Sequence, residues 1–365
     1  MSHPYTAVLI VPTGVGAAIG GYAGDALPVA RAMAQVCDRL ITHPNVLNGA
    51  QLYWSMDNTY YVEGYGLDQF AASDWGLQPV HQNRIGLLLD RGIEPELRLR
   101  HLQAADATRA TLGLNLTDYV VTDAPLEVQL RTAASGASWG TIGNPGSLLR
   151  GAEKLIRQTG ANAIAVVARF PDDQESIALN NYRHGAGVDA LAGAEAVISH
   201  LLVRQFQIPA AHAPALNPLP LEPNLSPRAA AEELGYTFLP CVLVGLARAP
   251  QFVTPEKLTS AETSQVLKEN FRDSSSTIWA NQVDTVIVPA SACGGSAILS
   301  FSGTSTQIIA VEENITQMQV PPEPLGIKAI RVNSYLEALG IVVAHRAGIN
   351  ADALRPSLSS LRCLT

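Results

Sequence analysis

Short apolar runs alternate with amphipathic stretches along most of this chain. Four runs rich in Val, Ile and Leu are bounded by turn residues, which is typical of strands buried on both faces. These runs are residues 6–11, 84–90, 119–122 and 163–168. Four other stretches place apolar residues at helical spacing. They are residues 25–41, 94–112, 146–158 and 191–201. The alternation predicts an α/β fold, with mainly parallel or mixed sheets flanked by helices.

The length of the chain indicates two domains. Its 365 residues exceed a typical single core, since one domain takes roughly 150 residues. Residues 208–227 are too rich in proline for a helix or a central strand, so they mark the crossing between the domains. We therefore predict an N-terminal α/β domain over 1–207, with an aromatic insertion near 51–80, and a C-terminal α/β domain over 208–365. Residues 237–244 read as a strand that resumes after the crossing.

Two glycine-rich loops follow predicted buried strands. Ile10-Val11-Pro12 leads into the first loop, and the similar Ile287-Val288-Pro289 leads into the second. If the likeness reflects a repeat, two similar α/β halves present these loops to a shared cleft, where small molecules commonly bind. Chance similarity in a chain rich in Ala and Gly is the alternative.

The first loop supplies one side of the predicted site. Its candidate ligand-binding residues are Thr13, Gly14, Gly16, Gly20 and Gly21. The glycine spacing only approximates the dinucleotide fingerprint, and the next helix begins several residues too late for a pyrophosphate at its N-terminus. A closely packed turn without a ligand is the alternative.

The second loop contains the main candidate for a catalytic nucleophile, Cys293. Backbone amides after it could point at the sulfur and depress the pKa of the thiol. The residues that would bind the ligand here are Gly294, Gly295 and Ser296, and the hydroxyl of Thr304 is a further candidate. His184 and His212 are the preferred proton partners. The alternative is a small buried cysteine in a tight turn.

Three further polar residues are candidate ligand contacts. His43 and Asn45 follow a predicted helix directly and either bind a ligand or make the turn. Arg183 precedes the positive end of a helix, where an anion is favoured. Charged residues at predicted strand ends are candidates of second rank, because ligands of parallel sheets gather there. These are Asp90, Asp123, Arg169, Asp172 and Asp173.

Composition narrows the class of partner and the compartment. A net charge of −8 without clustered Lys and Arg argues against a nucleic-acid partner or an anionic membrane. The four cysteines form no CxxC pair, which favours reduced thiols in a cytosol-like compartment over disulfides or structural zinc. The uncharged run from residue 6 to 24 is broken by Pro12, so we interpret it as a strand and loop rather than a membrane segment.

Several long motifs resemble a family of unknown function that occurs in cyanobacteria and plant plastids. They include VPTGVGAAIGGYAGDALPVARAM, THPNVLNGA, GVDALAGAEAVISH and VIVPASACGGSAILSF. The resemblance covers nearly the whole chain and implies a cytoplasmic protein, or a stromal one in plastids. It implies no catalytic roles.

Taken together, these residues predict an enzyme that acts on a small anionic metabolite, a carboxylate or phosphate, in a cleft between the two loops. A non-catalytic regulator that binds such a metabolite, and a structural or assembly protein, are the alternatives. No residue spacing specifies a metal or a cofactor. A small molecule is the expected partner, and homo-oligomerisation is the default for an apolar chain of this length.

Overall fold

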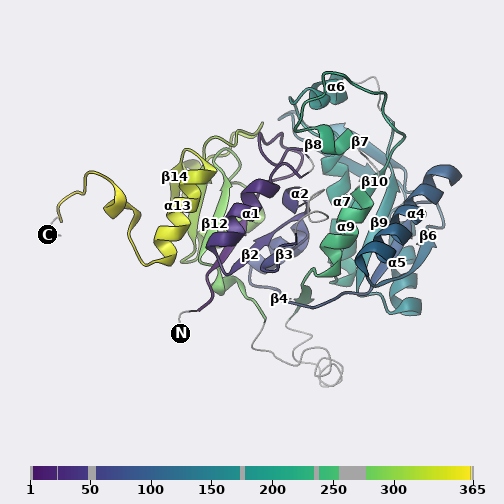
Figure 1. The fold of residues 1–365 in the computed structure, drawn as a ribbon, viewed down its shortest axis with the longest axis horizontal. Coiled ribbons are helices and arrows are strands. Elements are labelled where there is room, and N and C mark those ends of the chain that lie inside the picture. Colours follow the sequence, from purple (N-terminus) through teal and green to yellow (C-terminus); the bar gives the residue numbers. More distant parts are fainter. Residues whose placement is uncertain are drawn as a thin grey trace.

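The computed structural model describes residues 3–22, 24–47, 55–172, 177–233, 238–254, 277–361 and 363. Two parallel sheets stand side by side, each covered by helices on both faces (Figure 1). The fold is therefore α/β, as the sequence pattern predicts. Among the described residues, no helix is both long and apolar enough to cross a membrane.

The first sheet has six parallel strands from the two ends of the chain. In spatial order these are β14 (Ala329–Val332), β13 (Gln307–Val311), β12 (Thr285–Pro289), β1 (Thr6–Leu9), β2 (Arg39–Thr42) and β3 (Thr59–Tyr61). The strand order reverses between β1 and β12, which pair directly through Ala7 and Thr285. The two glycine-rich loops therefore leave neighbouring strands at the point where the order reverses.

The second sheet has four parallel strands from the middle of the chain. Its order is β10 (Ala210–Ala215), β9 (Ala163–Arg169), β5 (Ile85–Leu89) and β6 (Leu116–Val121). Two antiparallel pairs lie outside the sheets: β4 (Gly76–Gln78) with β11 (Gln251–Val253), and the hairpin β7 (Val128–Thr132) with β8 (Ser138–Ile142). The chain thus leaves the six-stranded sheet after β3 and returns to it at β12, so the sheets group the strands differently from the predicted division after residue 207.

Two apolar layers run across both sheets. One layer joins alternate strand residues such as Leu9 and Val167 to helices α1 (Leu27–Val36), α13 (Tyr335–Arg346) and α9 (Phe238–Ala247). The opposite strand residues, such as Val8 and Val166, pack on α3, α12, α5 and α7. These helices span Gly64–Ala71, Ser296–Ser302, Pro145–Thr159 and Ala192–Phe206. Since side chains alternate across a strand, each sheet is buried on both faces.

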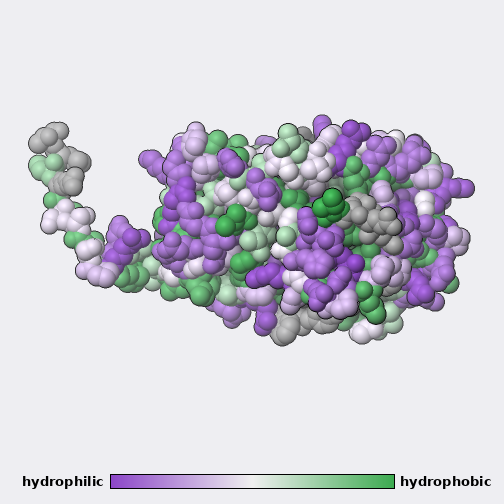
Figure 2. Space-filling model, turned by 90° about the horizontal axis from the view of Figure 1, so that it is seen from above, coloured by the Kyte–Doolittle hydropathy of each residue, from purple (hydrophilic) through white to green (hydrophobic). Residues whose placement is uncertain are grey.

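Two further helices, α2 (Pro44–Leu47) and α4 (Pro95–Leu112), bury Val46 and Leu97 in the first layer. The other elements of the described residues are α6 (Ile177–Arg183), α8 (Ala230–Glu233) and the short 3₁₀ helices Ala280–Gln282, Glu323–Leu325 and Ala351–Leu354. After α13 the chain extends away from the body, where Leu358 is exposed (Figures 1 and 2).

Two local predictions were wrong, and two other stretches contain regular elements. The helix predicted over 25–41 ends at Val36, and Arg39–Thr42 forms β2 instead. The predicted strand over 237–244 lies largely in helix α9. Within the proline-rich 208–227, residues Ala210–Ala215 form β10, which tolerates Pro214 because it is an edge strand. Within the predicted aromatic insertion, Thr59–Tyr61 and Gly64–Ala71 form β3 and α3; residues 51–54 lie outside the described residues.

Candidate functional site

A cleft lies where the carboxyl ends of β1, β2 and β3 meet helix α7 and strand β10. It holds about 750 Å³, counted with the space that is open to solvent. Five residues predicted from the sequence line this cleft: Thr13, Gly21, His43, Asn45 and His212. The other polar lining residues, apart from Tyr22, are Glu63, Asp189, Glu195, Ser199 and His200. The cleft is therefore a concave site with convergent polar groups.

Glu63 is the buried carboxylate at the centre of the cleft's polar network. It follows β3 and caps α3, because its Oε2 accepts the backbone N–H of Tyr65 at 2.8 Å. Its Oε1 pairs with Nδ1 of His200 and accepts a hydrogen bond from Ser199 Oγ at 3.4 Å. Glu63 is 4% exposed, so helix N–H groups and an imidazole replace water around its charge.

His212 continues this network from strand β10. Its Nδ1 lies 3.0 Å from Ser199 Oγ, and its Nε2 lies 3.8 Å from Oε2 of Glu195. Glu195 and Ser199 are four residues apart on α7, which places both on the helix face toward β10. We call His200, Glu63, Ser199, His212 and Glu195 the histidine cluster.

The pKa values of the two imidazoles of the histidine cluster are shifted in opposite directions. Burial, with a smaller effect from the charge of His200, lowers the pKa of His212 to about 3. Burial also favours the neutral form of His200, but the hydrogen bond and charge of Glu63 outweigh it and raise the pKa of His200. The cleft therefore contains one imidazole whose neutral form is favoured and a second whose protonated form is favoured.

His43 and Asn45 both hold the backbone of Val11 while they line the cleft. Nε2 of His43 accepts the N–H of Val11 at 3.0 Å, and Nδ2 of Asn45 donates to its carbonyl at 2.8 Å. Burial lowers the pKa of His43 to about 4, so the ring is neutral and carries its proton on Nδ1. These residues fix the loop after β1 and present polar edges to the cleft.

Asp189 is the third lining carboxylate, at the entrance to α7. Its Oδ1 accepts the N–H of Leu191 at 2.8 Å, and burial raises the pKa of Asp189 to about 6. Among the described residues, no Lys or Arg lines the cleft. The site is therefore rich in carboxylates and imidazoles, and only His200 among these groups favours a positive charge.

The other glycines of the first loop support the fold. Gly14, Gly16 and Gly20 have positive φ angles of 70°, 63° and 91°, which favour glycine. The carbonyl of Gly14 accepts the N–H of Ser138, so the loop is tied to the hairpin β7–β8. None of these three glycines lines the cleft.

The backbone of residues 315–320 lies between the two glycine-rich loops. Gln317 N–H donates to the Val15 carbonyl at 2.8 Å, and Cys293 N–H donates to the Val320 carbonyl at 2.9 Å. Only the first loop reaches the cleft.

Cys293 is fully buried beneath the second loop. Its Sγ faces the carbonyl oxygens of Pro289 and Ala290 at 3.7 Å. Burial raises the pKa of Cys293 to about 11, which is the opposite of the depressed pKa that we predicted. The loop amides do not offset the desolvation of this thiol.

A carboxylate of the protein already occupies the expected anion position after Cys293. Gly295 is the N-cap of α12, and Oδ1 of Asp68 accepts the N–H of Ala297 at 3.0 Å. The side chain of Ser296 also hydrogen-bonds to Asp68. Gly294 packs against Val320. None of Gly294, Gly295 and Ser296 lines the cleft.

The remaining predicted residues make local contacts away from the cleft. Arg183 pairs with Glu233 at 2.8 Å and donates to the carbonyl of Pro220. His184 Nδ1 lies 2.8 Å from the carbonyl oxygen of Asn180, one helical turn earlier. Thr304 closes the C-terminal turn of α12 by donating to the carbonyl of Phe301 at 2.7 Å. Arg183 is the last residue of α6 and His184 follows it, and neither meets the loop of Cys293 in any described contact.

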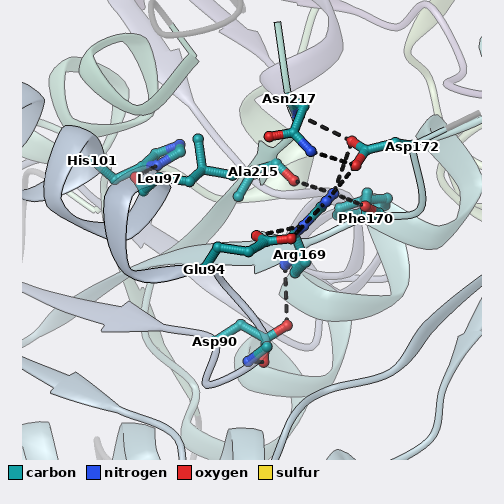
Figure 3. Close-up of polar contacts among 10 residues, drawn as sticks. Asp90, Glu94, Leu97, His101, Arg169, Phe170, Asp172, Ala215 and Asn217 are labelled. Carbon is teal, nitrogen blue, oxygen red and sulfur yellow. Dashed lines mark hydrogen bonds and ion pairs between the residues drawn. The ribbon is translucent and has the colours of Figure 1, made fainter. Parts of the chain in front are cut away.

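The second-rank candidates at the end of β9 form a closed cluster of charges (Figure 3). Arg169 pairs with both carboxylate oxygens of Glu94 at 2.9 Å and also with Asp172, which accepts from Asn217 Nδ2 at 2.6 Å. We call these four residues the arginine cluster. Below it, Asp90 accepts the backbone N–H groups of Gly92, Leu126 and Arg169.

The cluster ties the ends of the strands of the second sheet together. Asp123 is held similarly by Arg150, on the surface. Asp173 lies outside the described residues.

Sequence reasoning missed Glu63, Glu195, Ser199 and His200. An acidic residue directly between a strand and Gly64 is a helix N-cap signal, and it marks the carboxyl end of β3. Glu195 and Ser199 stand at helical spacing on an otherwise apolar helix, a signal for a shared polar stripe. That this stripe meets Glu63 depends on a contact between residues 136 positions apart.

Metal ligation requires at least three suitable side chains around one point. Within the part of the chain that the structure describes, no group of three or more His, Cys, Asp and Glu is placed to hold a metal ion. The imidazoles and carboxylates of the cleft are arranged as hydrogen-bonded pairs instead.

Fold and site define an α/β protein with a cleft of paired imidazoles and carboxylates beside a parallel sheet. The chain belongs to the family described as "Protein of unknown function (DUF3326)", whose model matches residues 6–355. A protein of Synechococcus sp. named an uncharacterized lipoprotein is 58% identical over 356 residues, which is 98% of this chain and 95% of that protein. No solved structure matches the chain.

The family confirms the resemblance to an uncharacterised cyanobacterial group. The name of the Synechococcus relative overturns the cytoplasmic location that we predicted, because a lipoprotein carries covalently attached lipid. Cysteine spacing could not have revealed this, since it reports on disulfides and metals only.

Proposed function

We propose that this protein is an enzyme that catalyses proton transfer on a small polar metabolite in the cleft. The observation that carries the proposal is the pair of neighbouring imidazoles with opposite pKa shifts, His200 raised and His212 lowered to about 3. Titratable groups whose environments push their pKa values apart are the usual arrangement of a general acid and a general base.

In this proposal His212 is the base. We assign the hydroxyl proton of Ser199 to its bond with Glu63, so that Ser199 accepts from Nδ1–H of His212. Nε2 of His212 is then free to take a proton from the substrate. Glu195, 3.8 Å from Nε2, stabilises the imidazolium that forms.

His200, held protonated by Glu63, is the acid that returns a proton to the substrate. The catalytic residues then reset through solvent, to which the cleft is open: His212 releases the proton that it took at Nε2, and His200, whose side chain is 42% exposed, regains the proton that it donated. No proton is gained or lost over the cycle. This balance suits an isomerisation, in which a proton is removed at one position and added at another.

The lining residues favour an uncharged or cationic reacting group over the anion that we expected. Three carboxylates, Glu63, Asp189 and Glu195, line the cleft, and among the described lining residues His200 is the one basic group with a raised pKa. An anion would meet repulsion from these carboxylates, which costs more in a partly desolvated site than in water.

Solvent deuterium exchange tests the proposal. Pools of small polar metabolites are incubated with the protein in D₂O, and mass spectrometry follows deuterium incorporation and product formation. We expect exchange with the wild type, and a rate at least about 10²-fold lower in H212Q and in H200Q. H81Q is the matched control, because His81 is exposed and lies outside the cleft.

A metabolite that binds without exchange or product would contradict the proposal and support a non-catalytic regulator. Exchange that persists in both H212Q and H200Q would contradict it as well.

A further inference from the structure

An apolar cavity adjoins the cleft beneath helix α6. It holds about 750 Å³, counted with the space open to solvent, and shares Asp189, Leu191 and Phe238 with the cleft. Nine of the fourteen described residues that line it are Leu, Ala, Pro or Phe, among them Leu130, Leu216 and Leu219. The two hollows are therefore neighbours with opposite chemistry.

The polar side chains of the cavity wall are already engaged within the protein. Asp172 is bound by Arg169 and Asn217, and Glu233 is bound by Arg183 at 2.8 Å. The hydroxyl of Tyr182 donates to the carbonyl of Gly21 at 3.1 Å. A ligand in this cavity therefore meets mainly hydrocarbon, and water gains few hydrogen bonds there.

We propose that the ligand of this protein is an amphiphile, whose polar group reacts in the cleft while its alkyl or acyl chain fills the adjoining apolar cavity. The inference rests on the proposed function for the position of the reacting group. The position of the chain rests independently on the wall that the two hollows share at Leu191 and Phe238. A wholly polar metabolite would leave this apolar surface exposed to water.

A series of 1-alkanols tests where the chain binds. Butanol, hexanol, octanol and decanol are titrated into the full-length protein by calorimetry. We expect the affinity to rise about fourfold for each methylene until the cavity is full, with a negative heat-capacity change. Affinity that does not change with chain length would overturn the inference.

Two tryptophan variants on one segment locate the binding. L219W fills the cavity, and we expect octanol to bind it at least about tenfold more weakly, as three methylenes would each contribute about fourfold. L221W is the matched control, since Leu221 is fully exposed and does not line the cavity. Equal effects of the two variants would overturn the inference. If L219W does not fold, L216N, which makes the wall polar, takes its place.

The alkanol series in H212Q separates this inference from the proposed function. We expect H212Q to keep the dependence on chain length, since His212 does not line the apolar cavity. Unchanged deuterium exchange in H212Q and H200Q together with a rising alkanol series would overturn the proposed function and support the cavity. Deuterium exchange that depends on His212 and His200, together with an alkanol affinity that does not change with chain length, would support the proposed function and overturn the inference about the cavity.

Discussion

The arginine cluster and the histidine cluster both place charged side chains beside the second sheet, yet they differ in how far the protein uses their hydrogen-bonding groups. Arg169 makes contacts to Glu94, Asp172 and the carbonyl of Phe170, and Asp172 is further bound by Asn217. The histidine cluster lines a polar cleft of about 750 Å³, counted with the space open to solvent. Asp172 and Asn217 also line a hollow, the apolar cavity, but their side chains are bound to each other and Asp172 is bound to Arg169.

The difference teaches that a charge at a strand end does not by itself mark a site. In the arginine cluster the hydrogen-bonding capacity is used by the protein, which favours a structural role. In the histidine cluster two neighbouring imidazoles have pKa values shifted in opposite directions and face an open cleft, which favours chemistry.

The largest expected effect is on the pH dependence of stability when His212 is replaced. The folded-state pKa of His212 lies below its ordinary value of 6.5, so the unfolded chain binds a proton first and His212 destabilises the fold as pH falls below 6.5. Gln at this position cannot titrate. We expect H212Q to gain about 3 kcal/mol of stability relative to the wild type between pH 6.5 and about pH 4.

Urea unfolding at several pH values measures this difference. The comparison between variants is needed because burial raises the pKa of Asp25 and of Asp189 to about 6, and protonation of these carboxylates stabilises the fold over the same pH range. H81Q, at an exposed histidine, provides the control and should follow the wild type. A pH-independent difference for H212Q would mean that His212 is not held neutral.

A smaller effect is expected from breaking the arginine cluster. R169M keeps the packing of the aliphatic chain but leaves Asp172 without its guanidinium partner, and Arg169 is only 16% exposed. We expect a loss of about 2 kcal/mol, reduced by solvent around the half-exposed Glu94. Urea midpoints measure the change.

R150M is the matched control for R169M, because it breaks an exposed arginine–carboxylate pair on the same sheet. We expect no measurable change in stability for R150M. R169M should also retain deuterium exchange, since Arg169 does not line the cleft. Equal stabilities for R169M and R150M would show that the arginine cluster does not stabilise the fold.

The smallest effect is expected at Cys293, the residue that the sequence favoured as nucleophile. With its pKa raised to about 11 and its side chain fully buried, Cys293 should resist iodoacetamide in the native protein, while the exposed Cys363 reacts. C293A should lose about 1 kcal/mol from the cavity it leaves and keep its exchange activity. Peptide mass mapping after alkylation gives the first result. Rapid labelling of Cys293, or loss of deuterium exchange in C293A, would contradict this account and support a catalytic role for the thiol.

The fold class could be predicted from the sequence, but the boundaries of several elements could not. Buried strands such as Ala163–Arg169 show continuous apolar residues, and their pattern is local. Phe238–Ala247 shows the same local pattern and is a helix buried almost all round, which a short apolar run cannot distinguish from a strand. The pairing of β1 with β12 joins residues about 280 positions apart, and no local pattern specifies such a contact.

The candidate site was predicted only in part, and for a physical reason. Thr13 and Gly21 line the cleft after the buried strand predicted over 6–11. His43 and Asn45 line it after β2, and His212 lines it from β10; the sequence pattern did not reveal these two strands. The glycine-rich loops misled us about Cys293, since glycine permits close approach by any backbone, and here residues 315–320 approach. The pairing of Glu63 with His200 depends on how β3 meets α7, which only the fold specifies.

The most direct test of the paired imidazoles is an NMR titration of the histidine side chains in the full-length protein, with H200Q and H212Q to assign the signals. Our account predicts that His200 keeps its proton to a pH above 6.5, whereas His212 stays neutral down to a pH well below it. If both rings titrate together near 6.5, the cleft holds no acid and base in opposite charge states, and the proposed proton transfer is contradicted.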